Sequence, residues 1–461
     1  MGNELGSSFR FVSAPTNSRV IPSEARNPSY RLMATKAKFQ AIKGTRDLLP
    51  PETELWNRVE QTAHEVFATF GFGEIRPPIF EPTDLFARAV GGETDIVSKE
   101  MYSFEDRDDT SVSLRPEATA SVCRAYIEHN MQQLPAPVKL YYLGPMFRRE
   151  RPQKGRYRQF YQIGAEILGG TDAPGIDAQV IEMVMSFFAR LGLEGVQLEI
   201  NSIGHNAPEC RRGYVEKLKA ALERVKEHLG EDSKRRIETN PLRVLDSKLE
   251  SEQAVIANLP RIGDHLCDEC AKHYKEVKRQ LELRGVAFKE NWRLVRGLDY
   301  YMRTTFEITA KGLGSQNAIC GGGRYDGLVE LLGGPPTKGI GFAIGQDRLV
   351  LSLQEAGKGS VALGRDVYIA WMGEKAQRAA IAVAQKLRNA GFRVELPPTE
   401  QKFGKALGQA DKLGSRYALI LGEDEVTSGH WTVKTLADGS QQKYTEAELF
   451  EFLSKQKQLS S

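Results

Sequence analysis

A basic stretch, FRRERPQKGRYRQF at residues 147–160, holds the clearest candidates for binding chemistry in this chain. Its positive side chains belong to Arg148, Arg149, Arg151, Lys154, Arg156 and Arg158, and its one acid is Glu150. Guanidinium groups donate paired hydrogen bonds to phosphate oxygens, so these residue types suit a polyanion that carries phosphate groups. A solvated basic turn would have the same composition, and composition alone leaves both interpretations open.

Acceptor groups next to this stretch suit a ligand that also has a cationic part. Gln162 and Glu166 alternate along the following segment, which places them on one face of a strand. The motif LRPEATA adds Glu117 and Thr119. These two residues also fit a helix N-terminus, where the helix dipole favours a carboxylate. The combination indicates a ligand that is part phosphate and part cation.

Two later motifs carry further candidates. LVRGLDYYMRTTFEI presents Arg296, Tyr300 and Tyr301, and CGGGRYDGL has consecutive glycines that permit close approach to a ligand. A buried tyrosine pair, a surface arginine and a tight turn would explain these motifs nearly as well. The chain lacks both G-x-x-x-x-G-K-[ST] and a G-x-G-x-x-G that opens a helix after a strand. If ATP binds, arginines must hold it.

The cysteines and histidines give weaker signals. Cys267, Cys270 and His273 in CDECAKH could begin a zinc site, but no second C-x-x-C or nearby pair completes four ligands, so no metal ligands are expected. The 5 cysteines are sparse and odd in number, which favours free thiols in a reducing compartment. The 7 histidines form no Ser-His-Asp or Cys-His pattern, so covalent catalysis is not indicated.

A large scaffold must position these residues. The chain has 461 residues, of which 41% are hydrophobic, and this predicts two or three domains. The 63 basic and 60 acidic side chains nearly balance, so any affinity for nucleic acid must come from local patches. No apolar run is long enough to span a membrane.

The first 32 residues are rich in Ser, Pro and Asn and lack an apolar core, which predicts a disordered extension rather than a secretory signal. Their excess of arginine would also fit an organelle transit peptide, although their prolines break any amphipathic helix. Met33 opens the first stretch with an ordered pattern, so it is an alternative initiator.

A helix is predicted from residue 50 to Gly71, because prolines and acids stand at its start and a glycine at its end. Leu55, Val59, Val66 and Phe70 would form its buried face. The next segment, GEIRPPIFEPTDLF, is extended, and its prolines place it at a sheet edge or an interface.

The predicted strands form a mainly antiparallel sheet. The runs KLYYLGPMF and RQFYQIGAEILG flank the basic stretch, which makes it the tip of a hairpin. Further strands lie in YYMRTTFEITA, NAICGGGRYDGL and GIGFAIGQDRLVLSLQ, and the last of these continues into a helix. Helices on one side of the sheet would complete an α+β domain. A Lys/Glu-rich helical stretch interrupts the strands, and strands alternate with helices after the linker EAGKGSVALGRD.

Taken together, these motifs resemble those of class II aminoacyl-tRNA synthetases, most closely the histidyl-tRNA synthetase family. KGTRDLLPPE resembles the family's opening, RPPIFEP its dimer-forming motif 1, FRRERPQKGRYRQFYQIGAE motif 2 and GIGFAIGQDRL motif 3. LVRGLDYY and GGGRYDGL resemble the two signatures that separate the histidine enzymes from their relatives. The resemblance extends from about residue 39 to the C-terminus.

The resemblance implies an antiparallel-sheet class II catalytic domain over residues 39–360, with a helical insertion at about 205–290. A C-terminal α/β anticodon-binding domain would span residues 365–461, and residues 1–38 would form the disordered extension. The implied protein is a cytoplasmic, homodimeric ligase that attaches histidine to tRNA(His) through a histidyl-adenylate. ATP and Mg²⁺ are the implied cofactors, and no membrane is involved.

The resemblance also implies a role for individual residues. Histidine would contact Glu117, Thr119, Gln162, Glu166, Arg296, Tyr300, Tyr301 and Tyr325, and ATP would contact Arg148, Glu150, Arg156 and Arg348. Arg148 and Arg296 would be catalytic, because they hold the α-phosphate and the carboxylate that attacks it. Glu117, Thr119 and Gln162 would bind the α-ammonium group. Glu166 and Tyr301, with Tyr325, would bind the imidazole. Gln153 and Lys154 would contact tRNA.

The chain departs from the family at QFYQ, where Tyr161 replaces a frequent histidine but Gln162 remains. One alternative is a non-catalytic, synthetase-like regulatory subunit of histidine biosynthesis. Such relatives usually lack the C-terminal domain and have lost the catalytic arginines. This chain has the arginines and the C-terminal sequence. A class II synthetase for proline, threonine or glycine would lack GLDYY.

Overall fold

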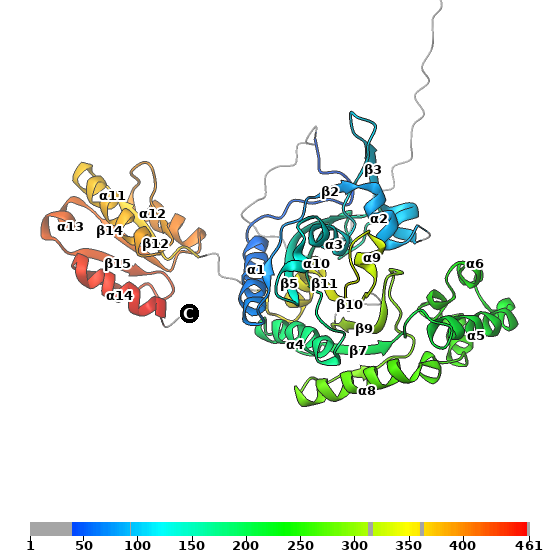
Figure 1. Ribbon diagram of the computed structural model, residues 1–461. Helices are drawn as coiled ribbons and strands as arrows, with labels where there is room; N and C mark the ends of the chain where they lie inside the picture. Colours follow the sequence, from blue (N-terminus) through cyan, green and yellow to red (C-terminus); the bar gives the residue numbers. More distant parts are fainter. Residues whose placement is uncertain (1–38, 93, 312–316, 360–363, 459–461) are drawn as a thin grey trace, which may run out of the picture. The chain divides into compact units, whose positions relative to one another are not determined.

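The computed structural model describes residues 39–92, 94–311, 317–359 and 364–458 (Figure 1). The extension expected over residues 1–38 lies outside the described residues, and so do residues 360–363 of the expected linker. Among the described helices, none combines the length and the apolar character needed to cross a membrane.

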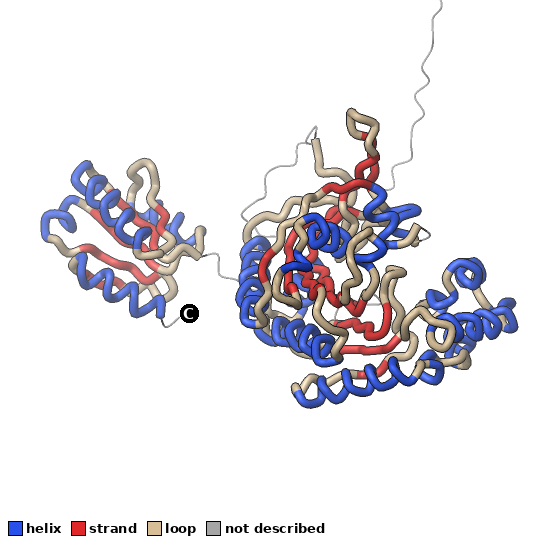
Figure 2. The backbone as a smooth tube through the Cα atoms, in the orientation of Figure 1, coloured by secondary structure: helices blue, strands red, loops and turns tan. Residues whose placement is uncertain are grey.

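The first part of the chain is built on a sheet whose strands are drawn red in Figure 2. It has eight strands in the order β1-β5-β6-β11-β10-β9-β7-β8. Its strands are β1 (Gly73–Glu74), β5 (Val138–Phe147), β6 (Gln159–Leu168), β7 (Gln197–Ser202), β8 (Lys289–Glu290), β9 (Met302–Thr309), β10 (Ala318–Arg324) and β11 (Gly339–Gly345). The pairings from β5 across to β7 are antiparallel, and only the short edge strands β1 and β8 pair in parallel. The predicted antiparallel sheet and the hairpin around the basic stretch are therefore confirmed.

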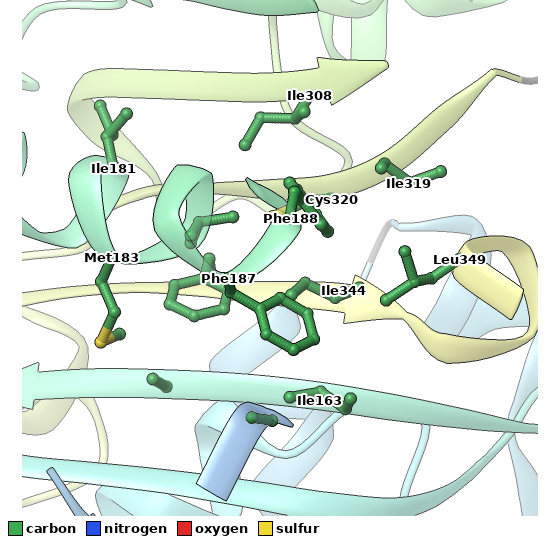
Figure 3. Close-up of a cluster of buried hydrophobic side chains, with 14 of the residues drawn as sticks. Ile163, Ile181, Met183, Phe187, Phe188, Ile308, Ile319, Cys320, Ile344 and Leu349 are labelled. Carbon is green, nitrogen blue, oxygen red and sulfur yellow. The ribbon is translucent and has the colours of Figure 1, made fainter. Parts of the chain in front are cut away.

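One face of this sheet is covered by helices α1 (Glu52–Thr69), α4 (Pro174–Arg190) and α10 (Gln346–Glu355), whose apolar side chains form the main core (Figure 3). The predicted helix after residue 50 is thus confirmed as α1. Its buried face differs in part from the prediction: Leu55 and Val59 are buried with Phe67, whereas Val66 and Phe70 are only half-buried. The difference arises because α4 packs against the side of α1 that carries Phe67, whose ring contacts that of Phe187.

Alternation along the central strands gives the sheet two different faces. The core on the α1 side includes Ile163, Ala165 and Ile167 of β6 with Ile340, Phe342 and Ile344 of β11. The residues between them, such as Gln162, Glu166 and Gly341, belong to the other face. Helices α2 (Thr83–Val90), α3 (Thr119–Glu128) and α9 (Leu328–Leu331) pack against part of that second face. Helices therefore lie on both sides of the sheet rather than on one.

The proline-containing segment after α1 forms β1 and then β2 (Phe80–Pro82), which pairs with β4 (Ser111–Leu114) and, through it, β3 (Tyr102–Glu105). Both β1 and β2 are edge strands. This agrees with the prediction made from the prolines, which cannot donate hydrogen bonds within a ladder.

Helices fill the stretch between β7 and β8, as its Lys/Glu-rich sequence predicted. They are α5 (Arg211–Arg224), α6 (Glu231–Thr239), α7 (Glu250–Ala257) and α8 (Asp268–Leu283). Leu218, Leu222 and Ile237 belong to a separate apolar cluster of this stretch, whereas Val277 and Leu281 of α8 join the main core. Figure 1 shows α5 and α6 in green, with α8 extending below β7.

The C-terminal part of the chain contains a five-stranded sheet in the order β13-β12-β14-β15-β16. Its elements are β12 (Val367–Trp371), α11 (Glu374–Asn389), β13 (Val394–Glu395), α12 (Phe403–Lys412), β14 (Tyr417–Leu421), α13 (Glu423–Ser428), β15 (Trp431–Thr435), β16 (Gln441–Tyr444) and α14 (Glu446–Gln458). Strands β13, β12 and β14 are parallel, and β15 and β16 add an antiparallel hairpin. This is the α/β unit that the alternation of strands and helices predicted.

A buried ion pair ties the sheet to α4. The side chains of Arg324 on β10 and Asp177 on α4 are 1% and 0% exposed. Arg324 Nε donates to Asp177 Oδ1 at 3.1 Å, and Arg324 Nη1 donates to Asp326 Oδ1 at 3.1 Å. Removal of Asp177 leaves the buried charge of Arg324 with Asp326 as its remaining partner, which is more costly than the loss of an exposed pair.

We therefore expect Asp177→Ala to lower the free energy of unfolding by about 3 kcal/mol or more, because Arg324 stays buried. The control is Asp232→Ala on α6, whose carboxylate is 51% exposed and contacts Arg235 and Arg236 at the surface. That variant should change the free energy by about 0.5 kcal/mol or less. Urea denaturation of both variants measures the difference, and equal effects would show that the buried pair is not a stability determinant.

Candidate active site

A cavity of about 280 Å³ lies on the face of the sheet that does not carry the main core. Strands β6, β11, β10 and β9 line its floor. Two glycines make room for polar side chains from neighbouring segments: a Cβ on Gly341 would lie 1.6 Å from Glu166 Oε2, and one on Gly321 would lie 2.0 Å from Arg296 Nη2. Any other residue at these two positions would displace a polar group of the cavity.

The structure brings together every residue that was predicted to contact histidine or ATP. The cavity is lined by Glu117, Thr119, Arg148, Glu150, Arg156, Gln162, Glu166, Arg296, Tyr300, Tyr301, Tyr325 and Arg348. The two residues predicted to contact tRNA are not among its lining residues. Gln153 forms a tight backbone turn with Arg156, and Lys154 Nζ lies 2.9 Å from Glu355 Oε1 at the surface.

Glu117 holds the start of α3 and also lines the cavity. Its Oε2 accepts a hydrogen bond from Thr119 N at 2.7 Å, and its Oε1 accepts one from Ala120 N at 3.0 Å. Burial raises the pKa of this carboxyl, and the hydrogen bonds from the helix start partly oppose that rise. The helix-start interpretation and the ligand interpretation of LRPEATA are therefore compatible, because one carboxylate serves both arrangements.

Glu166 lies at the centre of the cavity floor, directly opposite Gly341 on β11, and is 1% exposed. Thr119 Oγ1 donates to its Oε1 at 2.7 Å, and Tyr325 OH donates to its Oε2 at 2.6 Å. Burial outweighs these two hydrogen bonds and raises the pKa of Glu166 to about 8. This carboxyl can therefore exist with or without its proton near neutral pH.

Tyrosine rings form one wall beside Glu166. The rings of Tyr300 and Tyr301 lie 4.8 Å apart, and those of Tyr300 and Tyr325 lie 5.7 Å apart. Burial raises the pKa of Tyr301 to about 12, so its hydroxyl remains a neutral hydrogen-bond donor. The wall combines apolar ring faces with hydroxyl groups, which suits a flat ligand that carries hydrogen-bonding atoms.

Arginine side chains converge on the cavity from separate segments. Arg296 Nη1 donates to Glu307 Oε2 at 2.8 Å, Arg148 Nε donates to Pro116 O at 2.9 Å, and Arg156 Nε lies 2.6 Å from Glu150 Oε2. Arg348 donates to Gly155 O at 3.2 Å and to Ala318 O at 3.0 Å. Burial and, to a smaller extent, the positive charge of Arg156 lower the pKa of Arg348. Such a concentration of positive charge favours a bound polyanion.

Two polar atoms in the cavity wall have no protein partner among the described residues. They are Gln162 Oε1, an acceptor, and Arg296 Nε, a donor, and both are buried. Buried polar groups in native proteins are usually hydrogen-bonded. A ligand with both donor and acceptor groups would satisfy these two atoms.

Sequence reasoning missed some cavity residues. Glu307 pairs with Arg296, and its signal was an acid between the apolar residues Phe306 and Ile308 of a strand. Asp347 Oδ2 accepts from Tyr161 N at 2.9 Å and so holds the strand segment that carries Gln162. Asp347 is the second residue of α10, and its spacing gave no signal of a contact with β6.

The expectation that no second ligand pair lies near CDECAKH is wrong. His205 and Cys210 lie beside Cys267 and Cys270, and the four potential ligand atoms are all within 4.8 Å of one another. His273 has other neighbours, since its Nε2 is 3.0 Å from Asp172 O. The sequence did not reveal this group because a long helical stretch separates its two halves.

Comparisons with known proteins give a consistent result. A family model described as histidyl-tRNA synthetase matches residues 44–349, and one described as an anticodon binding domain matches residues 366–456. The histidine–tRNA ligase of Solibacter usitatus is 54% identical over 413 residues, which cover 89% of this chain and 98% of that protein. That of Koribacter versatilis is 51% identical over 421 residues, with 89% and 95% covered. The crystal structure of apo S. aureus histidyl-tRNA synthetase has a TM-score of 0.74 at 37% identity and covers 90% of this chain and 99% of that one.

The raised pKa of Glu166 predicts a specific pH dependence of stability. An unfolded chain releases this proton near pH 4.5, whereas the folded protein keeps it up to about pH 8. The folded state therefore binds more protons between these values, and this group's contribution to stability is lost as the pH rises, by up to about 1.4 kcal/mol per pH unit.

We expect the unfolding free energy of the wild-type protein to fall relative to that of Glu166→Gln as the pH rises from 5 to 8. The amide does not titrate and keeps a similar shape. Urea denaturation of both proteins at several pH values measures this difference. Parallel curves over the whole range would contradict the raised pKa.

Proposed function

We propose that this chain, which belongs to the histidyl-tRNA synthetase family, forms histidyl-adenylate from histidine and ATP in the cavity and then transfers the histidyl group to tRNA(His). The family membership makes it a ligase that charges tRNA(His). The two-step route, the ATP and Mg²⁺ requirement and the residue roles are the proposal. The observation that carries it is the convergence of arginines, buried acids and tyrosines on one cavity.

In the first step, a carboxylate oxygen of histidine attacks the α-phosphorus of ATP. A new O–P bond forms, and the bond to the bridging oxygen breaks to release pyrophosphate. Both reacting groups are anionic, so their approach needs positive charge on either side. Arg148 and Arg296 would hold the α-phosphate and the carboxylate, and no proton transfer to the protein is required. Orientation and charge neutralisation then account for the catalysis.

The outer phosphates of ATP would lie against Arg156 and Arg348. The donor set also fits Mg²⁺, because Glu150 and Glu307 supply carboxylate oxygens beside these arginines in the same cavity. When bound, Mg²⁺ would neutralise charge on the phosphate oxygens. Glu150 and Glu307 meanwhile keep Arg156 and Arg296 oriented before the substrates arrive.

Histidine would place its α-ammonium group against Glu117, Thr119 and Gln162. The unpaired Gln162 Oε1 is an acceptor for this cation. The imidazole would lie against Glu166 and Tyr301, with Tyr325 holding Glu166 in place through its hydroxyl. Since the pKa of Glu166 is about 8, its carboxyl can donate to a neutral imidazole or accept from a protonated one. An apolar amino acid would leave these buried groups unpaired and would be rejected strongly.

In the second step, a ribose hydroxyl at the 3′ end of tRNA attacks the histidyl carbonyl carbon and an ester bond forms. The bond from this carbon to the phosphate oxygen breaks, AMP leaves, and the hydroxyl proton passes to the departing phosphate or to solvent. We propose that Gln153 and Lys154 at the hairpin tip contact the acceptor end. Lys154 is 71% exposed and lies outside the cavity. A phosphate contact would require it to exchange Glu355 for the nucleic acid, a low cost for an exposed pair.

We also propose the division of the chain into a catalytic domain over residues 39–360, with its insertion at about 205–290, and an anticodon-binding domain over 365–461. The two matched family models agree with this division in outline. A cytoplasmic homodimer, formed through motif 1, is the assembly that we infer from the family.

The test of this function is ATP–pyrophosphate exchange with the purified protein, measured separately with each of the twenty amino acids. We expect exchange with histidine to exceed that with any other amino acid by about a hundred-fold or more, because the buried polar groups reject side chains that cannot pair with them. Exchange with a different amino acid would contradict the imidazole assignment. A folded protein that supports no exchange at all would favour the regulatory alternative.

The same assay tests the role of Arg296. Arg296→Ala should reduce exchange by about a hundred-fold or more, because the carboxylate loses its cationic partner. The matched control is Arg293→Ala in the same loop, whose guanidinium donates to Gln253 Oε1 at 2.8 Å and does not line the cavity. The control should keep near-normal exchange. Equal activity of the two variants would contradict the proposed role of Arg296 in the reaction.

A further inference from the structure

We propose that His205, Cys210, Cys267 and Cys270 bind one structural Zn²⁺ ion that joins the two ends of the helical insertion. His205 and Cys210 follow β7 and precede α5, whereas Cys267 and Cys270 stand at the start of α8. Cys210 and Cys270 are 1% and 0% exposed. None of the four residues lines the cavity described above.

The distances within the group approach those of a tetrahedral zinc site. His205 Nδ1 is 3.1 Å from Cys270 Sγ and 3.7 Å from Cys267 Sγ, and no pair of ligand atoms exceeds 4.8 Å. Zinc bonds of about 2.3 Å to sulfur and about 2.0 Å to nitrogen separate neighbouring ligand atoms by roughly 3.5 to 3.8 Å in a tetrahedron. Side-chain movements of about 1 Å or less would therefore complete the coordination.

Backbone N–H groups point at the sulfurs of Cys267 and Cys210, as they do around metal-bound thiolates. Cys267 is the N-cap of α8, and its Sγ accepts a hydrogen bond from Cys270 N at 3.5 Å. Cys210 Sγ accepts one from Cys267 N at 3.5 Å. Backbone N–H groups and a helix N-terminus favour negative charge on sulfur. A divalent cation would displace the thiol protons when it binds and would offset the negative charge of the sulfurs.

Two neighbouring residues support the same interpretation. A Cβ on Gly204 would lie 2.6 Å from Cys210 Sγ, so the glycine leaves the space that this sulfur occupies. Glu209 Oε1 is 3.7 Å from His205 Nε2, the ring nitrogen that does not face the sulfurs. A carboxylate near the second nitrogen of a metal-bound histidine is a common arrangement that orients the ring.

The donor set points to zinc and to a structural role. Three thiolates and one imidazole form a closed set of four ligands, which is typical of structural zinc and leaves no open position for a substrate.

The zinc site would also hold the proposed histidine pocket in place through one neighbouring residue. Arg211, next to Cys210, donates from Nη1 to the carbonyl oxygen of Tyr301 at 2.5 Å. The metal would thus fix the insertion to the strand that begins after Tyr301.

The first experiment is metal analysis of the full-length protein, purified under reducing conditions without added metal, together with replacement of zinc by Co²⁺. We expect one zinc per chain. The Co²⁺ form should show the visible absorption of a tetrahedral ion and a thiolate charge-transfer band. Mass spectrometry after alkylation should find all of the cysteines free once the metal is removed.

Variants identify the ligands. His205→Ala and Cys210→Ser should each lower the bound zinc at least about ten-fold. Loss of a group that only hydrogen-bonds to a metal ligand already weakens metal binding by about that factor. The matched controls are His273→Gln, the histidine that the sequence motif indicated, and Cys123→Ser, a buried cysteine on α3. Both controls should keep one zinc per chain.

Three results would overturn the proposal. The first is a wild-type protein that contains no zinc and gives no tetrahedral Co²⁺ spectrum. The second is a disulfide between two of Cys210, Cys267 and Cys270 in freshly purified, alkylated protein. The third is loss of zinc in His273→Gln with retention in His205→Ala. If a ligand variant does not fold, the Co²⁺ spectrum of the wild-type protein decides whether a tetrahedral thiolate site is present.

Discussion

The buried carboxyl group of Glu166 determines how the surrounding segments are built. An acid on a sheet face away from water is costly unless its oxygens are hydrogen-bonded. Thr119 at the start of α3 and Tyr325 after β10 supply those bonds, and Gly341 on the adjacent strand leaves the necessary space. Three segments that are distant in sequence must therefore meet at one point. The histidine part of the proposed site results from this meeting.

A second constraint is electrostatic. Several arginines lie close together in a partly buried cavity, and each is held by a carboxylate or a backbone carbonyl before any ligand binds. Their mutual repulsion disfavours the free cavity and favours a bound polyanion. Because the guanidinium groups are already oriented, little reorganisation is needed when negative charge develops. The sheet provides the rigid support that such an arrangement requires.

Local patterns predicted much of the fold. The alternation in KLYYLGPMF and RQFYQIGAEILG predicted the β5–β6 hairpin, and the capping residues predicted α1. The cavity residues were predicted through the resemblance to a family, since spacing alone left Glu117 and the tyrosine pair ambiguous. Contacts between distant segments were not predictable. The Arg324–Asp177 pair, the Glu307–Arg296 pair and the approach of His205 to Cys267 all depend on packing that sequence spacing does not encode.

We propose that Glu166 and Tyr301 recognise the imidazole of histidine by hydrogen bonds to its two ring nitrogens. The most direct test is equilibrium binding of histidine and of its two ring-methylated forms, each with one nitrogen blocked, measured by isothermal titration calorimetry. We expect either methyl group to weaken binding by about a hundred-fold or more, because a buried hydrogen-bonding group is left unpaired and a methyl group must be accommodated. Binding of either analogue as tightly as histidine would contradict it.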